Sequence, residues 1–138
     1  MVVGSRVVIL NEGKILLIHR LKYGKEYYVL PGGAIEKDES PENAAIREVK
    51  EETNLDVELN SLLWKFNENV NDEERLGYYF LANKFNGKLK LGGPEAKINS
   101  KNNSYLLEWF PIEELKNILF YPEEIGEKII AKFFRSES

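Results

Sequence analysis

One expected helix has a face made only of glutamates, and that face limits what the chain can fold into. Ser40 and Pro41 predict its start, because serine is a good N-cap and proline is favoured in the first helical turn. The helix is expected to run from Pro41 to Thr53, and Asn54 stands where a left-handed residue often ends a helix. At about 100° per residue, three carboxylates share an arc of about 100°. They belong to Glu48, Glu51 and Glu52.

The opposite side of this helix is expected to pack on a sheet, through Ala45, Ile46, Val49 and Thr53. Glutamates crowded on the acidic side repel one another by about 0.2–0.5 kcal/mol per pair. Those in the last turn also oppose the helix dipole, by about 0.3–1 kcal/mol each. A hard divalent cation such as Mg²⁺ reverses these penalties, because it favours carboxylate oxygens. The helix therefore predicts either a solvated acidic face or a metal site.

The loop before the helix favours the metal site. Here a glycine is followed by five residues and a glutamate, then by seven residues and the run Arg-Glu-Val-Lys-Glu-Glu. These positions are Gly33, Glu39, Arg47, Glu48, Val49, Glu51 and Glu52. Together with the preceding "LPGG", the pattern resembles the signature of the Nudix hydrolases, and the chain is closest in size to their compact MutT-like members. Asn54 departs from that signature, which has glycine there, and asparagine tolerates the same left-handed backbone.

The resemblance implies a Mg²⁺-dependent pyrophosphohydrolase, in which Mn²⁺ can substitute, that cleaves a phosphoanhydride in a nucleoside diphosphate linked to another group. By motif position, the metal ligands would be the carbonyl of Gly32 and the carboxylates of Glu48, Glu51 and Glu52. Glu48 would be a further ligand or a base. Arg47 would orient the glutamates, and Glu39 would help to position the loop or a water.

The general base and the substrate contacts are expected outside the motif. The base of this family commonly lies on a later loop, where Glu95 is the best-placed carboxylate and Glu108 is the alternative. Arg20 and Lys97 are the candidates for contacts with substrate phosphates. The markers of NADH- and coenzyme A-directed relatives and the downstream proline of ADP-ribose-type relatives are absent from the sequence. The resemblance therefore leaves a nucleoside triphosphate as the expected substrate.

The alternation of apolar and polar residues predicts one α/β domain over residues 1–138, with helices and a mixed β-sheet in an α/β/α sandwich like that of the resembled family. Strands are expected at residues 6–10, 14–21, 26–30, 55–66, 75–85 and 105–110. An acidic loop is expected over 67–74 and a long loop, lying over the active site, over 86–104. A short helix over 112–116 and a helix from about 122 to 134 complete the chain.

Composition and charge argue against several other classes of protein. The chain has no cysteine and a formal net charge of −4, so we expect no disulfide or thiolate site and no attraction to nucleic acid or acidic membranes. No signal peptide or membrane span is expected. We expect a cytoplasmic monomer or homodimer that binds a small nucleotide. A catalytically inactive Nudix-fold sensing or scaffold module is the alternative, and an unrelated Ca²⁺-binding domain a third, although no EF-hand pattern is present.

Overall fold

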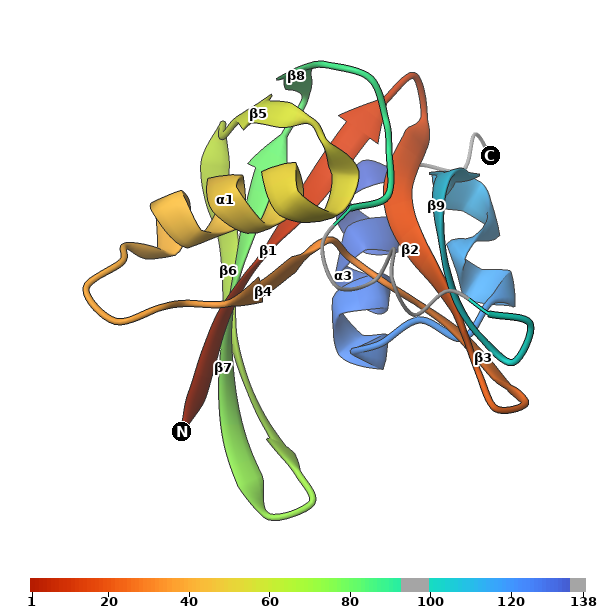
Figure 1. The fold of residues 1–138 in the computed structure, drawn as a ribbon, viewed down its shortest axis with the longest axis horizontal. Helices are drawn as coiled ribbons and strands as arrows, with labels where there is room; N and C mark the ends of the chain where they lie inside the picture. Colours follow the sequence, from red (N-terminus) through yellow and green to blue (C-terminus); the bar gives the residue numbers. More distant parts are fainter. Residues whose placement is uncertain (93–99, 135–138) are drawn as a thin grey trace.

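Strand β1 is central to the fold, because it pairs with three other strands. It spans Val2–Asn11 and forms the expected hairpin with β2 (Lys14–Lys22). It also pairs in parallel with β7 (Glu73–Ala82) and antiparallel with the short strand β4 (Gly32–Ala34). In the computed structural model, which describes residues 1–92 and 100–134, these pairings create a mixed seven-stranded sheet (Figure 1).

The other strands extend this sheet on both sides of β1. Its main path runs β3-β2-β1-β7-β6, with β9 paired to β2. These outer strands are β3 (Lys25–Val29), β6 (Ser61–Val70) and β9 (Asn103–Pro111). Two short strands, β5 (Asp56–Glu58) and β8 (Lys84–Asn86), pair separately with each other.

Helices cover both faces of the sheet. Successive residues of β1 point to opposite sides, so both faces present apolar side chains for a helix to cover. Val7 and Ile9 pack with the helix α1 (Pro41–Thr53) in one buried cluster. Val8 packs in a second cluster with the 3₁₀-helix η1 (Ile112–Asn117) and the helix α3 (Glu123–Phe133). Figure 1 shows α1 and α3 on different sides of the strands. This arrangement confirms the expected mixed sheet between helices.

Two sequence predictions about the middle of the chain are wrong. The segment 55–66 is not one strand, because the chain leaves β5 and enters β6 through Asn60, whose Oδ1 accepts a hydrogen bond from the Asn83 N–H at 2.9 Å. The acidic segment 67–74 is not a loop. Its only turn residues are Asn71 and Asp72, whose positive φ angles of 52° and 64° suit a two-residue hairpin turn.

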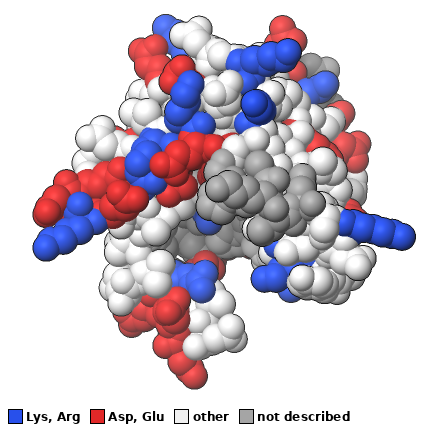
Figure 2. Space-filling model, in the orientation of Figure 1, with Lys and Arg blue, Asp and Glu red and all other residues white. Residues whose placement is uncertain are grey.

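Charge pairing explains why the acidic hairpin forms despite its composition. Glu68 on β6 lies opposite Arg75 on β7, and the Arg75 Nε lies 3.3 Å from the Glu73 Oε1. Opposite charges on facing strands stabilise a sheet, so the basic residue offsets its acidic neighbours. Figure 1 shows the β6–β7 hairpin extending beyond the other strands, and Figure 2 shows acidic side chains at its tip.

A third prediction is also wrong, because the expected strand 75–85 is divided at Asn83 into β7, which pairs with β1 and β6, and β8, which pairs with β5. Strand β9 begins at Asn103, which shortens the expected long loop, and both C-terminal helices are present. Within the described part of the chain, none of the helices has the length and apolar character needed to cross a membrane.

Candidate active site

Helix α1 is held to the sheet at its first turn. Ser40 caps it, because its Oγ accepts the Asn43 N–H at 3.0 Å. Ser5, which is fully buried on β1, donates its Oγ–H to the Pro41 carbonyl at 2.7 Å. The helix therefore begins where the sequence predicts, at a position fixed by both a cap and a strand.

The buried face of α1 is shifted round the helix from the predicted one, toward Ala44 and Glu52. Ala45, Val49 and Thr53 are fully buried, as expected, and so is Ala44. The prediction for Ile46 is wrong, because its side chain is 38% exposed. The two small alanines bring the helix close to the sheet, so the contact is centred on them and on Val49. Ile46 lies about 100° further round the helix than Ala45.

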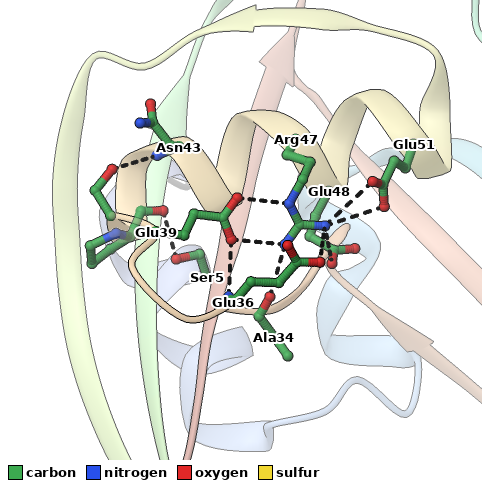
Figure 3. A network of polar contacts seen from close by, with 10 residues as sticks. Ser5, Ala34, Glu36, Glu39, Asn43, Arg47, Glu48 and Glu51 are labelled. Atoms are coloured by element: carbon green, nitrogen blue, oxygen red, sulfur yellow. Dashed lines mark hydrogen bonds and ion pairs between the residues drawn. The ribbon is translucent and has the colours of Figure 1, made fainter.

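Arg47 joins four of the glutamates in and before the helix (Figure 3). Its Nε and Nη2 donate to the two carboxylate oxygens of Glu39 at 2.7 and 2.9 Å. Its Nη1 contacts Glu48 at 2.9 Å and Glu51 at 3.3 Å. The same atom lies 3.7 Å from a Glu36 oxygen. Arg47 thus lies among the glutamates that it is predicted to orient, and that role stays a prediction.

The contacts with Arg47 fix the protonation of Glu39. Hydrogen bonds from Arg47 and from the Glu36 N–H lower the pKa of Glu39 from its ordinary value of 4.5 to about 2. The same pairing raises the pKa of Arg47. Glu39 is therefore an anion at neutral pH with both oxygens engaged, which suits a residue that positions the loop better than one that transfers a proton.

Two glycines let the acidic face of α1 approach β4. The Gly32 N–H donates to the Glu52 Oε1 at 2.7 Å, and Glu52 is only 7% exposed. Gly32 has a φ of 146°, and a Cβ on it would lie 2.2 Å from the Ser5 carbonyl oxygen. A Cβ on Gly33 would lie 2.6–2.8 Å from the Glu48 carboxylate. Only glycine fits at position 32, whereas a side chain at position 33 would have to displace the Glu48 carboxylate.

This donor set suits a hard divalent cation, which prefers carboxylate and carbonyl oxygens. Glu48 lies against Gly33 and the buried Glu52 against Gly32, and Glu51 shares the contact of Glu48 with Arg47. Among the described residues no three acidic or histidine side chains converge on one point, because Glu48 and Glu51 contact Arg47 instead. Binding a cation between them would require those two side chains to rotate.

The last turn of α1 is covered by the segment 88–92. Three hydrogen bonds join them: Lys90 N to Thr53 O at 2.9 Å, Gly92 N to Glu52 O at 3.1 Å and Asn54 Nδ2 to Lys88 O at 2.8 Å. Asn54 has a φ of 69°, which confirms the predicted left-handed cap. The carbonyls at the end of the helix thus have N–H partners beside the glutamates.

A cavity of about 720 Å³ lies next to Gly33, within the part of the chain that the structure describes. Its walls include three basic side chains, Arg6, Lys25 and Arg75. They also include three acidic ones, Glu68, Glu123 and Glu124, and three aromatic ones, Phe66, Tyr79 and Tyr121. Burial raises the pKa of Tyr79 to about 12, so its hydroxyl stays neutral. The cavity is aromatic and balanced in charge.

Three predicted site residues lie outside the motif, and no contact among the described residues joins any of them to α1. Arg20 is 5% exposed, and its guanidinium contacts Asn103 at 2.8 Å and lies 3.8 Å from the centre of the Tyr105 ring. Glu95 and Lys97 lie outside the described residues. The predictions for these three residues therefore stay predictions.

Glu108, the alternative base, points away from α1. Leu107 and Trp109 pack on the α1 side of the sheet, so the residue between them faces the other side. There the Glu108 Oε1 lies 2.8 Å from the Nδ1 of His19, which stacks on Tyr28. This location does not favour Glu108 as the base.

The cavity residues were missing from the sequence predictions. Arg6, Glu68 and Tyr79 come from three strands that meet only in the folded sheet. One signal was present, because Arg6 is a cation next to the apolar run "VVIL". Arginine is almost never fully buried unless it is paired, so such a residue is a candidate for the wall of a cleft.

Comparisons with known proteins agree with this geometry. The model of the NUDIX domain matches residues 2–133. A MutT NUDIX hydrolase from Burkholderia pseudomallei has a similar structure, with 27% identity, a TM-score of 0.75 and coverage of 93% of this chain and 96% of that one.

Two curated relatives differ in their named substrates. Diphosphoinositol polyphosphate phosphohydrolase 3-alpha from Mus musculus is 32% identical over 109 residues, which are 79% of this chain and 62% of that protein. ADP-ribose pyrophosphatase from Methanocaldococcus jannaschii is 31% identical over 121 residues, 86% of this chain and 66% of that protein. The match thus spans less than two thirds of these relatives. The family model, the structural match and the motif lead to one conclusion: the chain belongs to the Nudix family.

Proposed function

We propose that this protein is a Mg²⁺-dependent pyrophosphohydrolase that cleaves a phosphoanhydride in a nucleoside diphosphate linked to another group. The observation that carries the proposal is the position of the three-glutamate face of α1, beside two glycines at the rim of an aromatic cavity. A diphosphate at that rim would place the rest of its substrate in the cavity.

Each residue has a defined part in this proposal. Glu48, Glu51, Glu52 and the Gly32 carbonyl would hold the metal, which neutralises phosphates and lowers the pKa of an attacking water. Arg47 and Glu39 would hold the loop against the helix, and Arg47 would hold Glu48 and Glu51 until a cation binds. Glu95 remains the proposed general base.

The charge of the cavity supports a nucleotide over a polyphosphorylated inositol. Three basic and three acidic side chains line it, so among the described residues it offers no excess of positive charge to a ligand with many phosphates. Aromatic walls suit the flat face of a nucleobase. A nucleoside triphosphate remains the proposed substrate, and the relative named ADP-ribose pyrophosphatase adds ADP-ribose as a second candidate.

Arg20 remains a proposed phosphate contact for a physical reason. Its guanidinium is almost fully buried, yet no carboxylate of the described residues forms an ion pair with it. A buried cation without an anionic partner is costly, and a phosphate would offset that cost. The Arg20→Gln variant should therefore weaken nucleotide binding without loss of the fold.

The proposal is tested by phosphate or pyrophosphate release from a panel of nucleoside triphosphates, ADP-ribose and a diphosphoinositol polyphosphate, with and without Mg²⁺. We expect turnover of a nucleotide that depends on Mg²⁺. Nucleotide binding without turnover of any substrate would support the alternative, a sensing or scaffold module. Preference for the inositol compound would overturn the assignment of the substrate class.

Two further expectations belong to the same proposal. We propose that the protein acts in the cytoplasm, and that it is a monomer or a homodimer without nucleic-acid or membrane partners. Sedimentation of the purified protein across a range of concentrations measures the oligomeric state directly.

A further inference from the structure

Arg6 has an unusual place between the acidic helix and the cavity. On β1 it lies opposite Gly32 of β4 on one side and Tyr79 of β7 on the other. Its side chain lines the cavity. It passes so close to Gly32 that a Cβ there would lie 3.0 Å from the Arg6 Cγ. Arg6 is therefore adjacent to the backbone that Glu52 contacts.

The guanidinium of Arg6 is only partly engaged. Its Nη1 donates to the Leu30 carbonyl at 2.7 Å. Arg47 and Arg75, in contrast, form ion pairs with glutamates, and no such pair with Arg6 occurs among the described residues. A guanidinium has five N–H donors, so most donors of Arg6 have no protein acceptor in the part of the chain that is described.

We propose that Arg6 binds a phosphate oxygen of the substrate diphosphate from the cavity side of the Gly32–Gly33 strand. The proposal rests on the function proposed above. The carboxylates of Glu48 and Glu52 lie against Gly33 and Gly32, and Arg6 pairs with Gly32, so a diphosphate held by those carboxylates would lie beside Arg6. Arginine suits this contact, because its planar fork forms paired hydrogen bonds with phosphate oxygens.

A purely structural role for Arg6 predicts different behaviour. In that role the hydrogen bond from Arg6 to the Leu30 carbonyl holds the segment that leads into Gly32, and its loss would deform the cavity for every ligand. A phosphate contact, in contrast, affects only ligands that carry phosphate. The two roles are separated by comparing a nucleotide with its own nucleoside.

The test measures, by calorimetry in Mg²⁺, the binding of an α,β-methylene nucleoside triphosphate analogue and of the matching nucleoside. For Arg6→Gln we expect the analogue to bind about 10- to 100-fold more weakly, the range for a lost hydrogen bond to a charged group. The nucleoside should bind as it does to the wild type. Arg6→Lys keeps the charge and a donor for Leu30, so it should fold normally and lose less affinity than the glutamine variant.

Lys65→Gln is the matched control, because Lys65 is a cation of the same sheet that lies over the Tyr78 ring and is not among the described residues that line the cavity. We expect it to change analogue affinity less than about twofold. Equal losses in the Arg6 and Lys65 variants, or equal weakening of nucleoside and analogue, would overturn the contact. So would wild-type affinity in Arg6→Gln, or in Arg6→Lys if the first variant does not fold. Failure of the wild type to bind any nucleotide would instead overturn the proposed function.

Discussion

At the scale of single residues, Glu51 and Glu52 are neighbours in the chain with different surroundings. The Glu51 side chain is 51% exposed and contacts Arg47 at 3.3 Å. Glu52 is 7% exposed and accepts the Gly32 N–H. The sequence placed both on one acidic arc without distinguishing them, whereas in the structure only Glu51 is exposed. The two carboxylates should therefore respond differently to the same substitution.

We expect Glu51→Gln and Glu52→Gln to lower kcat by orders of magnitude, because each removes a proposed metal ligand. Only Glu52→Gln should also destabilise the fold, by about 1–3 kcal/mol. The buried acceptor of the Gly32 N–H loses its charge, and the new NH2 group is a buried donor. Without Mg²⁺, Glu51→Gln should melt at or above the wild-type temperature, because one of several crowded charges is removed. Thermal unfolding in EDTA measures both effects, and equal destabilisation would contradict this distinction.

Glu39 predicts a specific dependence of stability on pH. Its pKa in the folded protein, about 2, is below its ordinary value of 4.5, so the unfolded chain takes up the proton first as the pH falls. The Arg47–Glu39 contact therefore stabilises the fold above pH 4.5 and loses this effect between pH 4.5 and 2. Melting temperatures across that window should fall more steeply for the wild type than for Glu39→Gln. Parallel curves would show that the contact adds no stability.

Residue identities were easier to predict than residue partners. The motif spacing identified Arg47, Glu39 and the three glutamates from the chain alone, because they lie within one helix and its preceding loop. Burial of Glu52 depends on Gly32, twenty residues earlier in the chain and on another strand. Local periodicity contains no information about such a contact.

At the scale of elements, α1 carries like charges at the end where its dipole opposes them, and the segment 88–92 offsets this. Backbone N–H groups of Lys90 and Gly92 point at carbonyls of the last turn. They supply positive partial charge next to Glu51 and Glu52. The contact is close, since a Cβ on Gly92 would lie 2.4 Å from the Glu51 carbonyl oxygen. The segment thus fixes the turn that bears both proposed ligands.

We therefore expect Gly92→Ala to weaken Mg²⁺ binding by about 10-fold or more, as for other residues that orient metal ligands. The added methyl group must push the segment away from the helix carbonyls. Activity should recover at saturating Mg²⁺, which a general loss of structure would not allow. Metal titrations followed by calorimetry provide the measurement. Lys88→Ala is the control, because only the backbone carbonyl of Lys88 contacts Asn54; an equal effect there would contradict the role of Gly92.

Elements with strong local signals were predicted better than those defined by pairing. Helix α1 has a cap, a proline and a left-handed end, and its predicted bounds are confirmed. Strand β4 has three residues, two of them glycine, and exists only because it pairs with β1. The acidic hairpin was mistaken for a loop because the pairing of Glu68 with Arg75 is invisible in a run of charges.

At the scale of the whole molecule, the sheet separates the acidic helix from the floor of the cavity. The helix packs on one face of β1, through Val7 and Ile9. Arg6 and Tyr79 line the cavity on the other side of the same strands. Only the thin β4 strand, with its two glycines, lies at the boundary. Metal binding and nucleoside binding should therefore be separable by mutation.

Gly77→Ala tests this separation. A Cβ on Gly77 would lie 2.6 Å from the Tyr79 ring, so the ring would have to move within the cavity. We expect nucleotide affinity to fall by about 5- to 100-fold, the equivalent of about 1–3 kcal/mol of overpacking. Mg²⁺ affinity should stay within about twofold of the wild type, because the added methyl does not touch α1. A parallel loss of both affinities would show that the two regions are coupled.

The cap residue Asn54 also affects how far the signature can vary without loss of the site. A glycine there would relieve the left-handed strain but would remove the amide that donates to the Lys88 carbonyl. Asn54 has some backbone strain at its positive φ, but its side chain holds the segment 88–92 to the helix. Glycine would contribute backbone freedom at this position, whereas asparagine contributes a side-chain hydrogen bond. A family signature that requires glycine at this position would exclude chains such as this one, in which asparagine ends the helix and also binds the neighbouring segment.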